Sequence, residues 1–440
     1  MSEPSRQIHL NLFLYAHGHH EAAWRHPLAP KGSVLDIEHT IDCARKAEAA
    51  KFDSIFLADV LHIPEDIATS ARLWLEPLVT LSAVAVATTR IGLIGTASTS
   101  YTEPYNLARQ FASLDHLSKG RAAWNIVTSY SISAGPNFGE GERVTHHDRY
   151  ERGEEFVQAV KALWDSWSDD AVLDDRSGGR YADMSKIRTI DYSGQHYNVR
   201  GPLNVPRSPQ GWPVLVQAGS SESGRDFAAR HGEAVFTAHL DKSNAQEFYA
   251  DLKSRVDLKG RDPNGVLILP GISPMIAATE DEAKQKQQEL NELNSIETGL
   301  ARLSIRFDGY DFSNIKLDQV LSPDDFPDPE NNEGSRSRTQ LIIDAVKRER
   351  PTMRQLLATL AGARGHNVIA GAPEQIADII IEWVDSGAAD GFNVMPPLLP
   401  NMLDAFAEEV VPLLQKRGRF RTEYEGPTLR DHFGLGRPAA

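Results

Sequence analysis

Small hydroxyl and amide side chains stand near the ends of several apolar runs in the sequence. Thr96 comes late in one such run, Asn125 lies within another, and Asp59 closes a third. Groups of this kind can hydrogen-bond a neutral polar ring or a phosphate without an ionic clamp. The residue types therefore indicate a site for a polar ligand that carries few full charges.

A phosphate site is indicated where Gly219-Ser220-Ser221 opens an expected helix over 221–231. The free N–H groups of a first helical turn, the helix dipole and the serine hydroxyls together favour an anion. An ordinary serine N-cap explains the same pattern. The sequence alone leaves both interpretations open.

A second candidate for phosphate binding is the segment His146-His147-Asp148-Arg149-Tyr150. His146 and Tyr150 are four residues apart, so they share a face if this turn is helical. Both side chains can donate a hydrogen bond to a phosphate. A solvated first turn fits the same residues equally well.

Histidines near the start of the chain suggest a rival chemistry. His17-x-His19 after the first expected strand has the spacing found in metal-dependent barrel hydrolases. Such a site needs further His or Lys ligands on middle strands and an Asp after the last strand. Only His239 stands in a suitable place, so the ligand set is incomplete. We expect no metal site and a structural role for His17 and His19.

The elements that would position these residues alternate between short apolar runs and amphipathic segments. A strand is therefore expected where each apolar run lies and a helix where each amphipathic segment lies. The strand over 266–278 is expected to be broken by Pro270 and Pro274. The expected strands cover 8–14, 54–60, 91–99, 121–129, 213–219, 234–238, 266–278 and 391–395. The expected helices cover 34–50, 76–88, 104–117, 149–167, 221–231, 243–258, 373–385 and 401–417.

About eight repeats of strand and helix predict an α/β protein with a parallel sheet. An open doubly wound sheet and a closed (β/α)8 TIM barrel both fit the alternation. No G-x-G-x-x-G follows the first strand, and the repeat count favours the barrel. We expect one domain over residues 1–440, with insertions at about 168–212 and 280–371 and a C-terminal arm at about 420–440 that wraps the barrel or a neighbour. The second insertion is expected to contain a charged helix, EDEAKQKQQELNELN (280–294), and to act as a lid or to form an exposed excursion.

Composition excludes several classes of function. The net charge of -15 disfavours nucleic acid and anionic membranes as partners, because both attract basic surfaces. No stretch approaches the 18 apolar residues that a membrane-spanning helix needs, so we expect no membrane span. The one cysteine, Cys43, allows no intrachain disulfide and is expected to be a buried structural thiol in a helix. The N-terminal segment lacks a signal-peptide layout, so we expect a cytoplasmic protein.

Beyond these patterns, the chain resembles the bacterial-luciferase-like flavin monooxygenases. Within them it is similar to the subgroup of nitrilotriacetate monooxygenase component A, dibenzothiophene-sulfone monooxygenase and the pristinamycin synthase large subunit. The resemblance covers nearly the whole chain except roughly 279–350, and it is specific for the family but not for the substrate. The matching stretches include GHHEAAWRHP (18–27), KFDSIFLADV (51–60), LDHLSKGRAAWNIVTS (114–129), HDRYERGEEFV (147–157) and VLVQAGSSESGRDFAARHGEAVFT (214–237).

The resemblance implies that FMN binds at the C-terminal ends of the barrel strands. It implies that Asp59 and Thr96 lie by the isoalloxazine ring and that Thr96 and Asn125 line an oxygen pocket. It also implies that His20 is a substrate-pocket histidine, so the catalytic positions would be Thr96, Asn125 and His20. The residues implied to hold the ribityl phosphate are His146, Tyr150 and Ser221, with Ser220 as a weaker candidate.

The implied reaction uses reduced FMN and dioxygen to insert one oxygen atom into a small organic substrate through a flavin peroxide. A separate NAD(P)H-dependent flavin reductase would supply the reduced FMN, and the enzyme would be a homodimer or homotetramer. A deazaflavin-dependent dehydrogenase and a non-catalytic flavoprotein on the same barrel are the alternatives, ahead of a metal-dependent hydrolase. Without an obvious basic cluster, the substrate is expected to be uncharged and partly apolar. Candidate aromatic lining residues, each also explicable as core, are Trp24, Phe56, Trp74 and Phe138.

Overall fold

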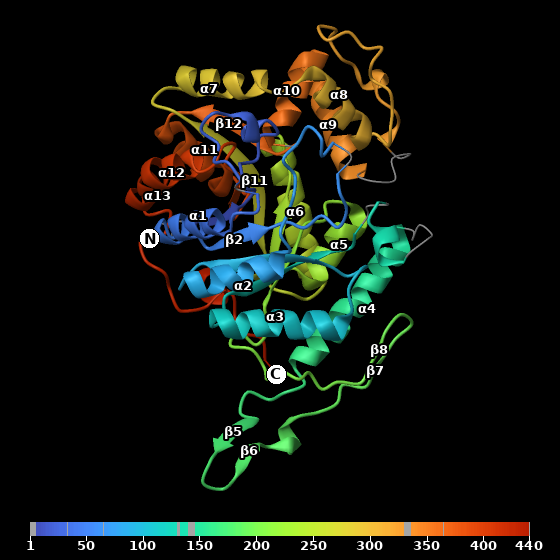
Figure 1. Cartoon of the computed structure of the whole chain (residues 1–440), viewed down its shortest axis with the longest axis vertical. Helices are drawn as coiled ribbons and strands as arrows, with labels where there is room; N and C mark the ends of the chain where they lie inside the picture. Colours follow the sequence, from blue (N-terminus) through green and yellow to red (C-terminus); the bar gives the residue numbers. More distant parts are fainter. Residues whose placement is uncertain are drawn as a thin grey trace.

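Eight parallel strands close into a barrel in the computed structural model of the chain (Figure 1). The structure describes residues 6–32, 34–64, 66–129, 133–139, 146–329, 336–363 and 365–439, and of these not the side chains of residues 146, 147, 336 and 337. The ring closes where β1 pairs with β13, so the predicted TIM barrel is confirmed. Its strands, in ring order, are β1 (His9–Phe13), β2 (Ser54–Leu57), β3 (Gly92–Ser98), β4 (Ala122–Val127), β9 (Val214–Gln217), β10 (Ala234–Thr237), β11 (Leu267–Ile276) and β13 (Gly391–Val394).

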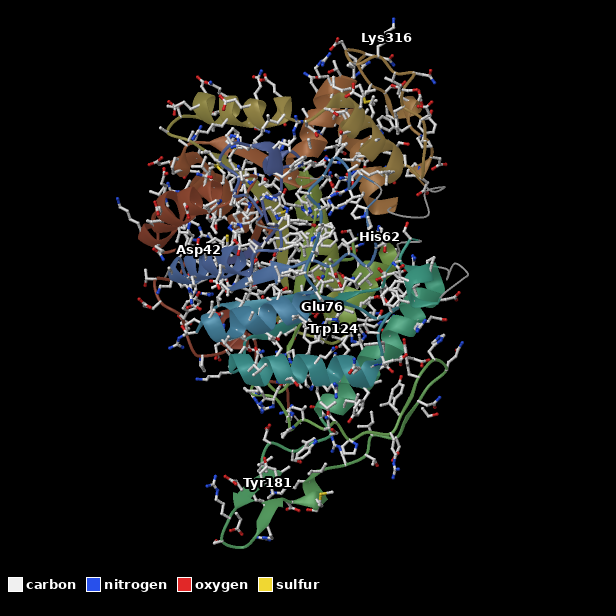
Figure 2. The ribbon with its side chains drawn as sticks, viewed as in Figure 1. Asp42, His62, Glu76, Trp124, Tyr181 and Lys316 are labelled. Carbon is white, nitrogen blue, oxygen red and sulfur yellow. The ribbon has the colours of Figure 1, made fainter. Side chains whose placement is uncertain are left out.

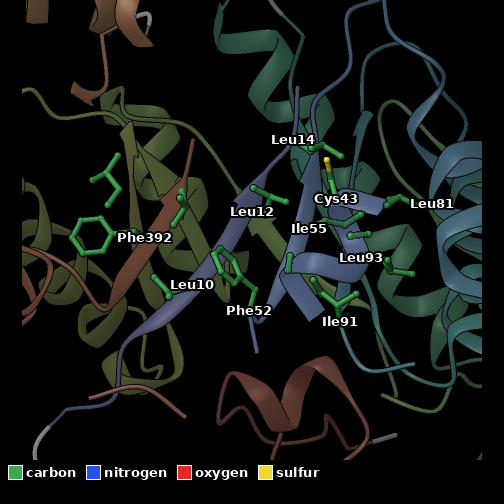
Figure 3. Close-up of a cluster of buried hydrophobic side chains, with 14 of the residues drawn as sticks. Leu10, Leu12, Leu14, Cys43, Phe52, Ile55, Leu81, Ile91, Leu93 and Phe392 are labelled. Atoms are coloured by element: carbon green, nitrogen blue, oxygen red, sulfur yellow. The ribbon is translucent and has the colours of Figure 1, made fainter. Parts of the chain in front are cut away.

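Helices follow the barrel strands and cover the outside of the ring. Alternate strand residues such as Leu10, Leu12, Ile55 and Leu93 point outward and pack under the helices, as Figure 3 shows. Burial of this apolar surface is the main force that holds each helix to the sheet. The helices are α1 (Ile37–Ala49), α2 (Pro77–Ala87), α3 (Pro104–Ser118), α4 (His146–Trp164), α5 (Glu222–His231), α6 (Lys242–Leu258), α11 (Pro373–Asp385), α12 (Asn401–Ala405) and α13 (Val411–Lys416).

Cys43 belongs to this outer core. It is fully buried on α1, and burial raises the pKa of its thiol to about 12. A thiol that stays protonated is a poor nucleophile. The expected structural thiol is therefore confirmed.

The inside of the barrel is packed with side chains rather than open. Phe13, Phe56 and Phe236 form an aromatic layer, in which the rings of Phe13 and Phe56 stack with centroids 4.6 Å apart. Leu429 and Phe433 belong to the same buried cluster. They come from the C-terminal arm, so the arm closes the N-terminal end of the barrel.

The arm is fixed to the barrel by ion pairs as well as by these two apolar side chains. It includes the short helix α14 (Leu429–His432). Arg430 pairs with Glu233 at 2.7 Å, and Arg421 pairs with the buried Asp53 at 2.7 Å. Residues 420–439 thus wrap their own barrel, one of the two roles expected for this arm.

Strand β11 differs from the expectation, because it runs unbroken from Leu267 to Ile276. A proline in a strand removes one N–H donor but keeps its carbonyl. Pro270 occupies the last position that pairs with β10, and Pro274 lies where β12 (Asn367–Gly371) has taken over the pairing. The change of partner keeps the strand continuous, so the predicted break was wrong.

Two excursions leave the barrel at opposite ends of the molecule's longest axis (Figures 1 and 2). Between α4 and β9 lie two antiparallel ribbons, and Tyr181 in one of them is labelled at one extremity of Figure 2. Their strands are β5 (Val172–Asp175), β6 (Arg180–Ala182), β7 (Tyr192–Ser193) and β8 (Asn198–Val199). Sequence analysis did not predict these strands.

The second excursion leaves the C-terminal end of β11 and packs as a helical unit. Phe307, Phe312 and Phe326 belong to its own buried cluster. Besides β12 it contains α7 (Glu280–Glu292), α8 (Ile296–Arg306), α9 (Arg336–Glu349) and α10 (Met353–Ala363). Of these helices, the sequence predicted only the charged α7. None of the described helices combines the length and the apolar composition that a bilayer span requires.

Candidate functional site

Thr96 and Asn125 lie side by side at the C-terminal ends of β3 and β4. They are register partners in the sheet, and Asn125 Nδ2 donates to Thr96 Oγ1 at 2.9 Å. The Thr96 hydroxyl in turn donates to the carbonyl of Leu57 on β2 at 2.8 Å. This chain of hydrogen bonds fixes the rotamers of both side chains across three strands.

The other side of the Asn125 amide is a buried acceptor. Its Oδ1 is buried and receives no hydrogen bond from any described residue. A buried acceptor without a donor is unfavourable by about 1–3 kcal/mol, so such an atom is a place where a ligand N–H or O–H would bind. The structure therefore places an acceptor for a polar ligand beside Thr96.

Asp59 follows the end of β2, two residues after Leu57, whose carbonyl accepts from Thr96. Burial raises the pKa of its carboxyl to about 6, although the N–H of Val60 donates to Oδ1 at 2.9 Å. Glu76, which caps α2, adds a smaller like-charge effect in the same direction. A carboxyl group with this pKa can donate a hydrogen bond in mildly acidic solution and accept one in neutral solution.

The turn between β9 and α5 starts a helix with a serine N-cap. Ser221 is the N-cap of α5, and its Oγ accepts from the N–H of Gly224 at 3.1 Å. Ser220 precedes it in the turn. A capping hydroxyl that accepts one hydrogen bond can still donate its own proton to a phosphate. The cap is present, and it is compatible with a phosphate site.

Sequence reasoning missed the residue that shapes this turn. Gln217 Oε1 accepts from the N–H of Gly219 at 2.6 Å. A side chain is excluded at Gly219, because a Cβ there would lie 2.5 Å from Gln217 Nε2 and 2.9 Å from the Gly224 Cα. A buried glutamine in the apolar run VLVQ was the available signal.

Tyr150 approaches the same turn from α4. Its hydroxyl would lie 3.2 Å from a Cβ placed on Gly219, and its ring packs edge-on against Phe227 of α5. His146 is the first residue of α4, one helical turn before Tyr150, and its side chain lies outside the described residues. The structure thus brings Tyr150, Ser220 and Ser221 together, as the expected phosphate site requires.

His20 is held within the protein through both ring nitrogens. Its Nδ1 accepts from the N–H of Ala22 at 3.1 Å, so its Nε2 carries the proton and donates to Asn291 Oδ1 at 2.9 Å. Asn291 belongs to α7 of the second excursion. His20 therefore ties the loop after β1 to that excursion, and it also lies in the lining of a cavity at the ends of β1 and β2.

The histidines of the metal alternative have other positions. His19 Nε2 donates to the carbonyl of Phe13 at 2.8 Å, and His239 Nε2 lies 2.9 Å from the hydroxyl of Thr237. Burial lowers the pKa of His17, and it lowers that of His239 to about 4. Among the residues that the structure describes, no group of three His, Cys, Asp or Glu side chains is arranged to hold a metal ion.

A cavity lies beside the ends of β1 and β2. Its lining includes Tyr15, Trp24, Leu57, Arg72 and Trp74. Leu57 is also the residue whose carbonyl accepts from Thr96, so this cavity adjoins the polar pair. The Tyr15 and Trp74 rings pack edge to face, with their centroids 6.0 Å apart.

The four aromatic residues noted in the sequence divide into three groups. Trp24 and Trp74 line the cavity. Phe56 is buried in the barrel interior. Phe138 is exposed and its ring stacks on that of Tyr101, with the centroids 4.7 Å apart.

Comparison with known proteins places this arrangement in a family. The model for luciferase-like monooxygenases matches residues 13–390. The chain belongs to the luciferase-like monooxygenase family. It is a flavin-dependent monooxygenase by that membership, which confirms the family and enzyme class expected from the sequence. The metal-dependent hydrolase is thereby set aside.

Similar proteins match almost end to end. The N-acetyl-S-(2-succino)cysteine monooxygenase of Bacillus subtilis strain 168 is 46% identical over 438 residues, which are 100% of this chain and 99% of that protein. Component A of the nitrilotriacetate monooxygenase of Aminobacter aminovorans is 45% identical over 446 residues, 99% of this chain and 98% of that one.

Solved structures agree with this assignment. A riboflavin lyase crystallised with modified FMN and riboflavin has a TM-score of 0.87 at 32% identity, and the match covers 98% of this chain and 97% of that one. The EDTA monooxygenase of Chelativorans sp. BNC1 has a TM-score of 0.81 at 34% identity, with 98% and 99% covered.

Proposed function

We propose that this enzyme binds reduced FMN, delivered by a separate NAD(P)H-dependent flavin reductase, and inserts one atom of dioxygen into a small organic substrate. The observation that carries the proposal is the buried Oδ1 of Asn125 beside Thr96, with Asp59 following the neighbouring strand β2. A flavin ring presents N–H groups that such acceptors can bind. The Ser221 turn lies on the next strand of the ring and offers donors for a phosphate.

These residues fit FMN in hydrogen bonding. We assign Asp59, Thr96 and Asn125 to the ring. We assign the ribityl phosphate to Tyr150, Ser220 and Ser221, together with His146. A phosphate at the start of α5 gains from the helix dipole and from N–H groups that have no acceptor within the helix. When bound, the reduced flavin supplies two electrons to dioxygen, so that one oxygen atom enters the substrate and the other leaves as water.

The chain's own contribution is to position groups and exclude water. Thr96 and Asn125 hold each other in one orientation, so the oxygen-facing side of the ring would meet fixed dipoles rather than mobile solvent. Asp59 can hold or release a proton near the ring at physiological pH. The helices α7 to α10 cover the same end of the barrel and shield it.

The separate reductase is supported by the names of relatives. The word "component" in the name of the nitrilotriacetate monooxygenase relative denotes one part of a larger system. Pristinamycin IIA synthase is likewise divided into separately named subunits, and two of them match this chain. The cytoplasmic location expected from the sequence remains part of the proposal.

We also propose a homo-oligomer with α2 in its interface. This helix is apolar on every face, and Val79 and Val86, seven residues apart, are 72% and 77% exposed. Two exposed valines on one face of an apolar helix are typical of a surface that another copy of the chain covers. Light scattering at micromolar concentration would reject this if it gave the mass of a single chain.

The proposed cofactor site is tested by anaerobic titration of the protein with photoreduced FMN. A modest dissociation constant, in the micromolar range, is expected for a cofactor that must enter and leave. Absence of binding at tens of micromolar would reject the proposal. A flavin-free preparation removes interference from any flavin retained during purification.

A further inference from the structure

The cavity at the ends of β1 and β2 combines aromatic walls with one cationic side chain. Tyr15, Trp24 and Trp74 give apolar surface, and Arg72 contributes a guanidinium group that is 26% exposed. Arginine presents five N–H donors in a planar fork that matches a carboxylate. The protein as a whole carries a charge of -15, so a cation placed in a cavity is a specific local feature.

Only part of the Arg72 fork is used inside the protein. Its Nη2 donates to Asp66 Oδ1 at 2.5 Å, and its Nε donates to Ser70 Oγ at 3.2 Å. No described residue accepts a hydrogen bond from its Nη1. The two contacts fix the plane of the guanidinium while leaving one edge available.

Asp66 is itself held from the second excursion. Arg302 of α8 donates from Nε to Asp66 Oδ2 at 2.7 Å and forms an ion pair with Glu21. Arg302, Glu21 and Asp66 have side-chain exposures of 7%, 6% and 6%. Glu21 also lines the cavity, but its charge is balanced by Arg302. An entering anion would therefore meet a fixed donor edge and a paired carboxylate.

The cavity and the proposed flavin site share one piece of backbone. Leu57 and Ala58 line the cavity and directly precede Asp59. A molecule that fills the cavity would thus contact the backbone segment that leads into Asp59, which is proposed to lie by the ring of the cofactor.

We propose that this cavity is the substrate pocket and that Arg72 binds a carboxylate of the substrate. The substrate class is a small organic acid whose remaining atoms pack against Tyr15 and Trp74. Arg72 is a specificity-determining residue, and Arg302 is a positioning residue that acts through Asp66. This inference rests on the proposed function, because the cavity is a substrate pocket only if the protein is the proposed monooxygenase. It differs from the uncharged substrate expected from the sequence, which showed no basic cluster because the contacts that hold Arg72 in the cavity join segments far apart in the chain.

The test is calorimetric titration of the flavin-free protein with nitrilotriacetate, N-acetyl-S-(2-succino)cysteine and the methyl esters of both. At least one acid is expected to bind, and its ester is expected to bind at least tenfold more weakly. Arg72→Gln should weaken binding of that acid by about tenfold to a hundredfold, with partial recovery in Arg72→Lys. Arg354→Gln, which removes an exposed arginine paired with Asp318, is the matched control and should bind as wild type does.

Three outcomes would overturn the proposal: no acid binds, the ester binds as tightly as its acid, or Arg72→Gln binds as wild type does. Thermal melting and FMN titration of each variant identify one that has merely lost its fold. Failure of the proposed function has a different signature. In that case the acids would bind through Arg72, but the protein would not bind reduced FMN.

Discussion

Asn125 Nδ2 donates to Thr96 Oγ1 at 2.9 Å across the paired strands β3 and β4. The contact leaves the Asn125 carbonyl oxygen buried and directed away from its own partner. Two residues that are 29 positions apart in the chain thus act as one unit at the mouth of the barrel. The proposed oxygen chemistry depends on that unit staying in one orientation.

Thr96→Val tests this dependence. Valine keeps the branched shape but removes the acceptor for Asn125 and the donor to Leu57. We expect the yield of oxygenated product per reduced FMN to fall about fivefold, which corresponds to about 1 kcal/mol for a buried hydrogen bond, with more hydrogen peroxide released. Thr359→Val, the same change on the surface of α10, serves as control. An unchanged product yield in Thr96→Val would contradict the role of the pair.

Ser221→Ala separates phosphate binding from helix capping. Loss of the cap should lower the free energy of unfolding by about 1 kcal/mol, and loss of a hydrogen bond to phosphate should weaken FMN binding by about tenfold to a hundredfold. Ser295→Ala removes an equivalent N-cap from α8, where Ser295 accepts from the N–H of Thr298 at 3.1 Å. Only the first variant should lose FMN affinity. Equal FMN affinities in both variants would assign Ser221 to capping alone.

Asp59→Asn probes the carboxyl group whose pKa burial raises to about 6. As pH rises from 5 to 7, this group becomes a carboxylate beside a cofactor that carries a phosphate, so FMN affinity should fall. The FMN phosphate titrates in the same way with the asparagine variant. The difference between the plots of FMN affinity against pH for the two proteins therefore gives the effect of ionising Asp59. Two parallel curves would show that Asp59 does not face the cofactor.

Acid sensitivity of the C-terminal arm follows from His432. Burial lowers its pKa to about 4, and the nearby charge of Asp53 only partly opposes this shift. In the unfolded chain the His432 imidazole becomes protonated near pH 6.5, whereas in the folded chain it stays neutral down to about pH 4. The free energy of unfolding should therefore fall as pH drops from 6.5 to 4, by up to about 3 kcal/mol.

His432→Gln removes this titration. Denaturant unfolding of the variant should show a smaller loss of stability between pH 6.5 and 4.5 than wild type shows. His116→Gln changes an exposed histidine on α3 and should keep the wild-type slope. If the free energy of unfolding of His432→Gln fell with pH as steeply as that of wild type, other groups would be responsible for the acid sensitivity.

The barrel and the strand-end residues were predictable because both follow from local periodicity. Thr96 and Asn125 lie late in apolar runs and Ser221 follows one, and parallel strands bring their C-terminal ends to one face. The strand β11 was misjudged because its two prolines were weighed without the change of neighbour that accommodates them.

The rest of the site depends on contacts between distant segments. Arg72, Asp66 and Arg302 form one network, yet Asp66 and Arg302 are 236 positions apart. Sequence periodicity does not report such pairing. Helices α8 to α10 were missed for a related reason, because their apolar residues pack on one another within a stretch that is otherwise polar and rich in proline. The resemblance implied a substrate pocket around His20, which does line the cavity, but its hydrogen bond to Asn291 joins segments 271 positions apart and could not be predicted from the sequence.

The most direct test of the central claim is where the electrons enter. Purified protein with NADH, FMN, oxygen and an organic acid that it binds should consume NADH no faster than free flavin does. Addition of an unrelated NADH-dependent flavin reductase should start oxygenation of the acid, and labelled dioxygen should place one labelled atom in the product. Rapid NADH oxidation by this protein alone, or product that carries no label, would contradict the account.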